Sequence, residues 1–221
     1  MTDTNGQRYA VVMGDLVRSE SSLPIELLHE RFNQAVDHQN LEHAAKLISP
    51  LTITLGDEFQ GLTHTVTQAI EIARGLRLEL LAEKIDCRFV IGTVEIKSPL
   101  NSSKAWNMMG PGLARARKKL NQKKADQFYR FSIAEAPVTE VLLDAIGVGL
   151  STIERSWTDQ QRDDISALIG GLSPNELSQR RNVSVHSIYK VRSSGDFDAY
   201  TLQWNAVNKA LSEFEKQGKL S

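Results

Sequence analysis

The sequence predicts an α+β fold: a ferredoxin-like, antiparallel sheet with helices, followed by a small all-α unit that contains a helix-turn-helix. Over residues 9–133, short runs rich in Val, Ile and Thr alternate with amphipathic stretches in the order β-α-α-β-β-α-β-α-β. One pair of these runs meets at a tight Gly-Asp turn, as in a split βαβ sheet. Beyond about residue 156 the pattern is helical throughout. We therefore expect two domains, at 1–150 and 151–221.

The first half of the sheet region is expected to hold three strands and two helices. The first strand, 9–14, is rich in Val and stops at a glycine. Residues 24–38 place apolar side chains on one helical face and charges on the other, and 40–48 form a weaker helical stretch. Residues 50–63 are expected to form a hairpin, because Gly56 at the first turn position suits type II′ geometry.

The second half continues with a helix, a strand, a basic helix and a last strand. Residues 65–83 carry an apolar stripe at helical spacing, and 86–96 are rich in Val and Ile. The helix over 104–121 is strongly basic, and 127–133 form the last strand of the sheet. We expect the helices to pack on one face of this sheet.

A domain boundary is expected near residues 147–156. A helical stretch that begins at Pro137 is interrupted by Gly147-Val-Gly149, and only helical patterns follow. The last of these patterns, over 198–217, carries a broad apolar stripe. This helix either closes the core of the tail or forms the seam of a dimer.

Capping signals divide the tail into short helices. Thr158-Asp-Gln-Gln161 and Ser173-Pro-Asn-Glu176 are capping boxes, and the second has Pro at the first helical position. A tight turn at Asn182-Val-Ser184 leads into the next helix, which Ser184 can cap. Two short helices joined by a turn of three or four residues make a helix-turn-helix.

Positive charge gathers on this helix-turn-helix, since residues 178–195 contain no acidic side chain. Lys and Arg bind phosphates, and polar side chains on the exposed face of a helix read base edges. The pattern resembles the helix-turn-helix of bacterial regulators of the sigma-factor and response-regulator types. The residues expected to bind DNA are Arg180, Arg181, Ser184, His186, Ser187, Lys190 and Arg192. A small helical bundle with a solvated basic face is the alternative.

Composition narrows the function without identifying it. A net charge of −1 suggests neither a nucleic-acid nor a membrane partner for the chain as a whole. The single cysteine, Cys87, excludes an intrachain disulfide and a zinc site built on several cysteines. The N-terminus lacks the pattern of a signal peptide, and no apolar run approaches about 20 residues. A cytoplasmic location is therefore expected.

Two aspartates carry the main functional signal. Asp15 and Asp57 each follow a glycine at the end of an apolar run, so each strand delivers a carboxylate to the rim of the sheet. If the strands are neighbours, the carboxylates converge and repel unless a cation lies between them. Hard oxygen ligands of this kind suit Mg²⁺ or Mn²⁺, and a metal pair can hold a nucleotide triphosphate. The alternative is that both aspartates are turn residues.

The basic helix offers a second candidate feature. Residues 115–124 are rich in Arg and Lys and contain no acidic side chain. Arg115, Lys118 and Lys119 share one helical face, where they could reach triphosphate oxygens or meet DNA beside the tail. A solvated helix surface is the alternative.

These motifs together resemble the catalytic palm of class III nucleotidyl cyclases and of diguanylate cyclases over about residues 8–133. The hairpin Gly56-Asp-Glu-Phe59 is similar to the signature of the diguanylate cyclases, and Phe89–Val94 followed by Trp106–Gly110 resembles paired segments of the class III enzymes. With the helical tail, the whole chain resembles the SatD family. The resemblance implies a metal pair at Asp15 and Asp57.

The resemblance also assigns a phosphate-binding role to the loop after the first strand. That loop begins Leu16-Val17-Arg18-Ser19 and would wrap the phosphates with backbone amides at a helix N-terminus. Arg115 is the basic side chain expected to join it.

The groups that read the base and stabilise the transition state differ from the cyclase pattern. Ile53 stands where class III cyclases have a purine-reading Lys, and Asn107 where they have a base-reading Asp. Ala114 replaces their transition-state Asn and Lys118 their transition-state Arg. Leu55 replaces the first hairpin glycine of the diguanylate cyclases. Because preorganised cations supply much of phosphoryl-transfer catalysis, such a site can bind nucleotide without turning it over.

Two hypotheses of function follow, together with a plain adaptor protein as a third. In the first, the chain is a transcription regulator whose palm binds a nucleotide with a divalent metal while the tail binds DNA as a homodimer. In the second, the chain is a nucleotidyl cyclase or nucleotidyltransferase whose tail is an accessory module. Its candidate catalytic residues are Asp15, Asp57 and Lys118.

Overall fold

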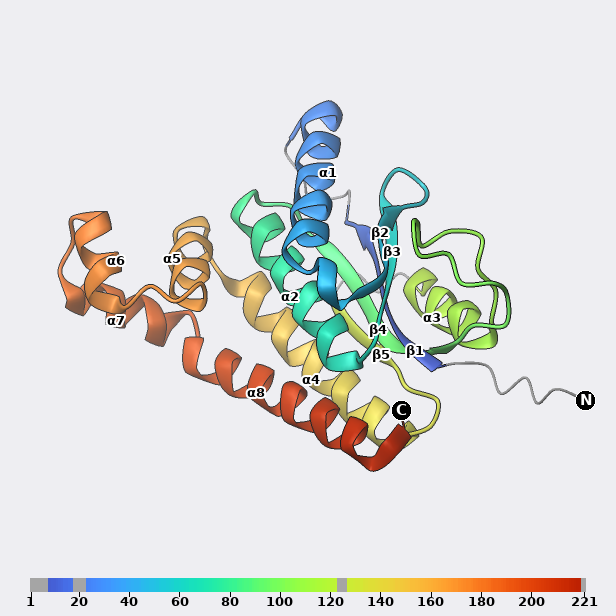
Figure 1. Ribbon diagram of the computed structural model, residues 1–221. Helices are drawn as coiled ribbons and strands as arrows, with labels where there is room; N and C mark the ends of the chain where they lie inside the picture. The colour runs from blue at the N-terminus through green and yellow to red at the C-terminus, as the bar shows by residue number, and fades with distance from the viewer. Residues whose placement is uncertain (1–7, 18–22, 123–126, 220–221) are drawn as a thin grey trace, which may run out of the picture.

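The computed structural model describes residues 8–17, 23–122 and 127–219, which contain one five-stranded sheet. The strand order is β2-β3-β1-β4-β5 (Figure 1). The strands are β1 (Arg8–Leu16), β2 (Leu47–Ile53), β3 (Glu58–Thr63), β4 (Cys87–Glu95) and β5 (Tyr129–Ser132). Neighbours are antiparallel except β4 and β5, which are parallel. The predicted α+β class and element order are confirmed, but the sheet is mixed and not wholly antiparallel.

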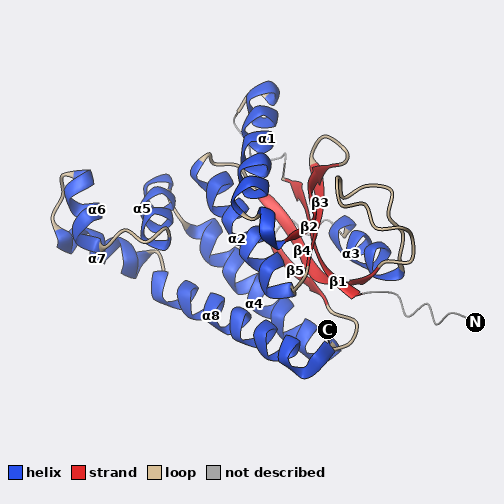
Figure 2. Cartoon of the chain, in the orientation of Figure 1, coloured by secondary structure: helices blue, strands red, loops and turns tan. Residues whose placement is uncertain are grey.

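Helices cover both faces of this sheet, so the prediction that they pack on one face is wrong (Figure 2). One face carries α1 (Ile25–Glu42), α2 (Val66–Ala82), α4 (Pro137–Ser156) and α8 (Phe197–Phe214), and the other carries α3 (Pro111–Asn121). The reason lies in the central strand β1. Its Val12 joins the larger core, whereas Val11 and Met13 join a second core with Leu113 of α3. A strand that is apolar on both faces needs cover on both.

Two helices start or end away from their predicted positions. The helix predicted over 24–38 extends to Glu42, and the weak stretch after it is only the 3₁₀ turn η2 (Ala44–Lys46). The basic helix begins at Pro111, not at residue 104. A close approach fixes this start, since a Cβ on Gly110 would lie 1.8 Å from the backbone oxygen of Glu95. The chain before Pro111 therefore forms a long loop against the sheet.

Helix α4 runs without a break through Gly147-Val-Gly149, so the predicted interruption is wrong. A Cβ on Gly147 would lie 2.3 Å from the backbone oxygen of Tyr129 in β5. The glycine is needed because helix and strand pack closely there, and the helix tolerates it. The predicted division at residue 150 falls inside this helix.

Three short helices follow, and their predicted caps are confirmed. They are α5 (Asp159–Ile169), α6 (Pro174–Arg181) and α7 (Val185–Ser194). Thr158 and Ser173 form capping boxes, and the Ser184 side chain accepts a hydrogen bond from the Ser187 backbone. Asn182 makes the turn between α6 and α7 with a left-handed φ of 52°. A small core joins these helices through Leu168, Leu177 and Ile188.

The last long helix, α8, packs mainly on the main core, while its first residue, Phe197, also touches the core of the short helices. Its Tyr200, Trp204, Val207, Leu211 and Phe214 belong to the same apolar cluster as the sheet. Figure 1 shows α8 running back along α4 toward the sheet. Among the described residues, no helix has both the length and the apolar character needed to cross a membrane.

Candidate functional site

Asp15 lies near the end of β1, and Asp57 lies in the turn directly before β3, the strand that pairs with β1. Asp15 in β1 stands opposite Glu58 in β3 and opposite Arg88 in β4. The backbone N–H of Leu16 donates to the backbone oxygen of Asp57 at 2.9 Å. The hairpin end and the end of β1 therefore meet at one rim of the sheet, on the side that α3 covers.

Asp15 is already paired with a cation, which is the Arg88 side chain. Nε of Arg88 donates to Oδ1 at 3.0 Å and Nη2 donates to Oδ2 at 2.5 Å, and both residues are at most 6% exposed. A bidentate guanidinium contact is among the stronger polar contacts in proteins. Arg130 lies near this pair, and burial together with the Arg88 charge lowers the pKa of its guanidinium. Asp15 thus balances positive charge at this rim.

This arrangement does not fit a metal pair held by both aspartates. Both oxygens of Asp15 accept from Arg88, so a divalent ion would have to displace a buried guanidinium. Asp57 is half-buried on the hairpin and makes contacts of its own. No chemical step therefore passes through a metal at Asp15. Sequence reasoning missed Arg88, although a lone arginine in the apolar run after Cys87 was a usable signal.

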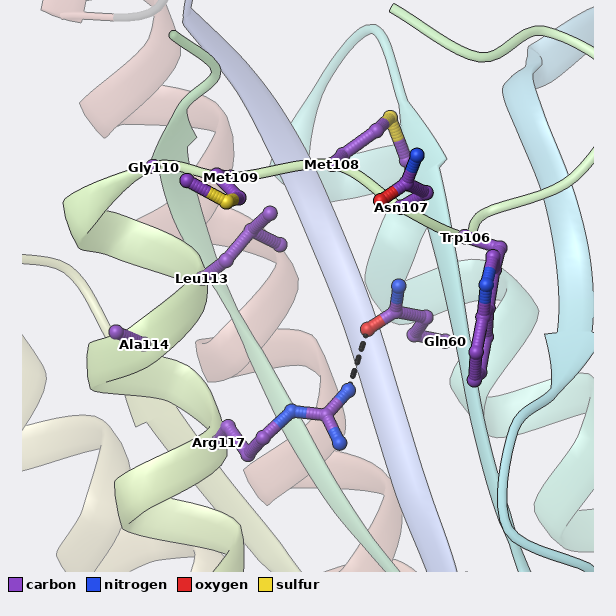
Figure 3. Close-up of a pocket in the computed structure, with 9 residues that line it drawn as sticks. All are labelled: Gln60, Trp106, Asn107, Met108, Met109, Gly110, Leu113, Ala114 and Arg117. Carbon is purple, nitrogen blue, oxygen red and sulfur yellow. Dashed lines mark hydrogen bonds between the residues drawn. The ribbon is translucent and has the colours of Figure 1, made fainter. Parts of the chain in front are cut away.

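A cavity of about 450 Å³ opens beside this rim, between β3, α3 and the loop before α3 (Figure 3). Its lining comprises Gln60, Trp106, Asn107, Met108, Met109, Gly110, Leu113, Ala114 and Arg117. Arg117 donates to Oε1 of Gln60 at 2.8 Å and lies 3.5 Å from a carboxylate oxygen of Glu58. The cavity therefore has an aromatic ring and amide groups in its wall and a guanidinium at one end.

Trp106 is half exposed, at 50%, and lines this cavity. Part of the indole is therefore accessible from the cavity. Asn107, next to it, has a left-handed φ of 56°, which Asn tolerates better than most residues. No periodicity distinguishes such loop residues, so only the resemblance to paired cyclase segments drew attention to them.

The predicted phosphate loop is only partly described. Leu16 and Val17 are buried, and their backbone N–H groups are used inside the protein. Leu16 donates to Asp57, and Val17 donates to the backbone oxygen of Asp86 at 2.8 Å. These two amides therefore already have acceptors other than a phosphate. Arg18 and Ser19 lie outside the described residues.

Most of the predicted basic face of α3 is turned toward α4. Arg115 pairs with Glu140 of α4 at 2.6 Å, and Lys119 reaches the same carboxylate at 2.8 Å. Lys118 is exposed. Arg117, which sequence reasoning did not select, is the basic residue of α3 that lines the cavity. The end of the basic run, at 123–124, lies outside the described residues.

The predicted DNA-binding residues divide into two groups. Two arginines are paired within the protein: Arg181 with Asp164, and Arg192 with Asp198 at 2.7 Å. Ser187 is half-buried and hydrogen-bonded to Ser184. The exposed members are Arg180, Ser184, His186 and Lys190. These four residues lie on α6, at the N-cap of α7 and on α7 itself.

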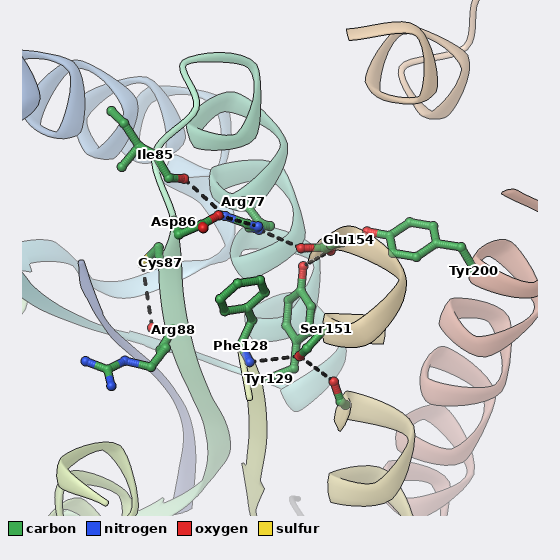
Figure 4. A network of polar contacts seen from close by, with 11 residues as sticks. Arg77, Ile85, Asp86, Cys87, Arg88, Phe128, Tyr129, Ser151, Glu154 and Tyr200 are labelled. Atoms are coloured by element: carbon green, nitrogen blue, oxygen red, sulfur yellow. Dashed lines mark hydrogen bonds and ion pairs between the residues drawn. The ribbon is translucent and has the colours of Figure 1, made fainter. Parts of the chain in front are cut away.

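Behind the sheet lies a buried polar network that sequence reasoning missed (Figure 4). Arg77 of α2 donates to Glu154 of α4 at 2.8 Å and to Asp86 at 2.9 Å. The hydroxyls of Tyr129 and Tyr200 donate to the same Glu154 side chain at 2.5 and 2.7 Å. Burial, followed by the Glu154 charge, raises the pKa of both tyrosines well above the usual value. The network joins α2, α4, β5 and α8 in one place.

Comparisons with known proteins agree with part of this picture. The model of the SatD family matches residues 9–200. The guanylyl cyclase domain of the RhoGC fusion protein from Blastocladiella emersonii is 13% identical, with a TM-score of 0.40 over 54% of this chain and 76% of that one. A bacterial light-regulated adenylyl cyclase is 12% identical, with a TM-score of 0.40 over 57% of this chain and 43% of that one. No curated protein sequence matches the chain.

Proposed function

The chain belongs to the SatD family, and from that premise we propose that it binds a nucleotide in the cavity beside Trp106. The observation that carries the proposal is the composition of the cavity wall. A half-exposed indole, an amide at Asn107 and a guanidinium at Arg117 are the groups that a base and a phosphate require. The volume of about 450 Å³ lies in the range of small-molecule sites.

Each end of a nucleotide has a chemical partner in this cavity. An indole face stacks on any base, and such stacking contributes about 1–3 kcal/mol. The amide of Asn107 can donate to and accept from the edge of a base. The planar guanidinium of Arg117 suits phosphate oxygens. Before a ligand binds, its contacts with Glu58 and Gln60 hold it in position.

A divalent ion is proposed to bind only together with the nucleotide. Mg²⁺ or Mn²⁺ would neutralise part of the triphosphate charge, and Asp57 on the hairpin is the carboxylate proposed to meet it. Asp15 would remain paired with Arg88. On this proposal nucleotide binding does not require a metal at Asp15.

Binding without turnover is favoured over an active nucleotidyl cyclase or nucleotidyltransferase. The cavity wall carries Ala114, whose side chain cannot stabilise developing charge. Of the candidate catalytic residues, Asp15 is held by Arg88 and Lys118 is exposed. The enzyme remains the second candidate, because triphosphate bound beside Asp57 would be positioned for transfer chemistry.

Calorimetric titration with each of the four nucleoside triphosphates, with and without Mn²⁺, tests the proposal. We expect one-to-one binding of at least one of them. Trp106→Ala should weaken it roughly tenfold, since a stacked base contributes about 1–3 kcal/mol. Arg117→Gln should weaken triphosphate more than nucleoside. Arg115→Gln is the matched control, because that arginine pairs with Glu140 away from the cavity.

The same samples distinguish a protein that only binds nucleotide from an enzyme that turns it over. Release of pyrophosphate from a bound nucleotide would establish the enzyme and reject binding without turnover. Binding with no release of pyrophosphate supports binding without turnover. If no nucleotide binds, or if Arg115→Gln weakens binding as much as Arg117→Gln, the cavity is not a nucleotide site.

A second proposed role is DNA binding by the tail as a homodimer, which would make the protein a nucleotide-responsive transcription regulator. Supporting it are the short α6 with the exposed Arg180, the turn at Asn182, and α7 with the exposed His186 and Lys190. Paired half-sites on DNA are the reason to propose a dimer. A nucleotide would switch such a protein only by binding its two states unequally.

Charge reversal at Arg180 and Lys190 tests this role. We expect the double variant Arg180→Glu, Lys190→Glu to lose retention on duplex DNA. The slope of log affinity against log salt concentration should fall by about one for each phosphate contact that is lost. Lys209→Glu is the matched control, since Lys209 is exposed on α8 away from the turn. Gel-shift titrations at several salt concentrations measure both. Equal retention by the two variants would remove DNA from the function.

A further inference from the structure

A histidine and two glutamates meet on the face of the protein opposite the cavity. His38 and Glu42 lie one helical turn apart on α1, and Glu79 faces them from α2. One possible ligand atom from each lies within 4.8 Å of the others. Nδ1 of His38 is 2.9 Å from Oε1 of Glu79. The packing of α1 against α2 therefore brings three ligand groups together before any ion binds.

We propose that His38, Glu42 and Glu79 bind one transition-metal ion, of which Zn²⁺ fits best. Zn²⁺ accepts imidazole nitrogen and carboxylate oxygen at about 2.0–2.2 Å, so two ligand atoms of a tetrahedral site lie about 3.3–3.6 Å apart. The three groups need only a small side-chain shift to reach that spacing. Two carboxylates and a neutral imidazole also balance the charge of a divalent ion. Mg²⁺ and Ca²⁺ are disfavoured because they prefer oxygen ligands alone.

A buried amide supports one of the ligands. Gln39 is 1% exposed, and its Nε2 donates to the Oε1 atom of Glu79. Its own Oε1 is buried and has no hydrogen-bond partner among the described residues. Such orphaned buried oxygens are uncommon in folded proteins. The amide nitrogen therefore holds Glu79 from the buried side, while the amide oxygen lies against Gly75 of α2, where a Cβ would come within 2.5 Å of it.

Space for a further ligand lies next to the cluster. His38 and Glu79 line a cavity of about 350 Å³ between α1 and α2, together with Arg31, Gln34 and Glu83. A three-residue site that opens on such a cavity can take water or a small anion in the fourth position of a tetrahedral ion. Arg31 in this cavity is paired with Glu83 at 3.6 Å, so water is the expected fourth ligand.

A bound ion would also change the electrostatic environment of the neighbouring side chains. Glu42 lies 4.0 Å from Nε2 of His43, and Glu79 raises the pKa of His38 through their hydrogen bond. A bound ion would replace the proton that His38 otherwise shares with Glu79. It would also join α1 to α2 across their contact, so the folded protein should become more stable when the ion binds.

Titration of untagged, chelator-treated full-length protein with Zn²⁺, and with Co²⁺ as a spectroscopic probe, tests the site. We expect one ion per chain, Co²⁺ absorption bands of four-coordinate type, and a higher melting temperature with Zn²⁺. His38→Ala and Glu79→Gln should each weaken Zn²⁺ binding at least roughly tenfold. His29→Ala is the matched control, because His29 is exposed on the same helix and outside the cluster.

Each possible outcome either supports the metal site or overturns it. Loss of binding in His38→Ala and Glu79→Gln, with His29→Ala unchanged, supports the site. Wild-type protein that binds no Zn²⁺, or His38→Ala that binds as tightly as wild type, overturns it. Equal loss in His29→Ala shows only adventitious surface binding and also overturns it. Because the cluster lies across the sheet from Trp106, none of these results bears on nucleotide binding.

Discussion

Glu154→Gln is expected to lower the free energy of unfolding by about 3 kcal/mol, the low end for breaking a buried ion pair. Glu154 is fully buried and accepts from Arg77, Tyr129 and Tyr200. Glutamine keeps the shape but removes the charge, so Arg77 is left with Asp86 as its remaining carboxylate. If the amide oxygen keeps both tyrosine hydroxyls, the amide nitrogen takes the place of Oε2 and faces the Nε–H of Arg77, donor against donor.

Urea unfolding and thermal melting measure this loss. For a chain of this size the melting temperature should fall on the order of 10 °C. Glu213→Gln is the control, since Glu213 is an exposed helical glutamate paired with Lys216, and its loss should stay below about 0.5 kcal/mol. If both variants unfold at the same urea concentration, the buried network does not stabilise the junction of α2, α4 and α8.

Asp15→Asn is expected to destabilise the protein by about 3 kcal/mol, because it leaves Arg88 buried near Arg130 without a carboxylate. A purely metal-binding Asp15 would behave in the opposite way, since removing one of two repelling carboxylates would leave stability unchanged or raised. Asp57→Asn is the matched control on the hairpin. Its effect should stay within about 1 kcal/mol, since Asp57 is half-buried.

A double variant keeps the prediction for Asp15 testable even if Asp15→Asn folds poorly. Asp15→Leu with Arg88→Met removes both charges and should recover most of the stability that Asp15→Asn loses, as apolar replacement of buried ion pairs often does. Urea unfolding of the single and double variants gives the coupling between the two residues. A double variant as unstable as the sum of its single changes would mean that Asp15 and Arg88 do not depend on each other.

The sequence was sufficient to predict the strands, their order along the chain and the meeting of the Asp15 and Asp57 strands. It was sufficient because strand periodicity, glycine stops and capping boxes are local signals. The faces of the sheet were not predictable in the same way. The continuous apolar run of β1 indicates cover on both sides, but it does not say which helix covers which side, and the expectation of helices on one face overlooked it.

The candidate site depends on tertiary pairing, which local patterns do not carry. Arg88 neutralises Asp15 only because β4 lies next to β1 in the register that places them opposite each other. Gly147 has the pattern of a helix breaker but serves the close packing of α4 on β5. Tryptophan side chains are usually largely buried, but Trp106 lies in a loop beside a cavity. In each case the neighbour across the fold decides the role.

A crystal structure of the protein with a nonhydrolysable nucleoside triphosphate and Mn²⁺ tests the central claim most directly. The account predicts the base against the indole of Trp106, phosphate oxygens within hydrogen-bond distance of Arg117, and Asp15 still paired with Arg88. Nucleotide bound elsewhere, or an empty cavity at saturating nucleotide, would contradict it.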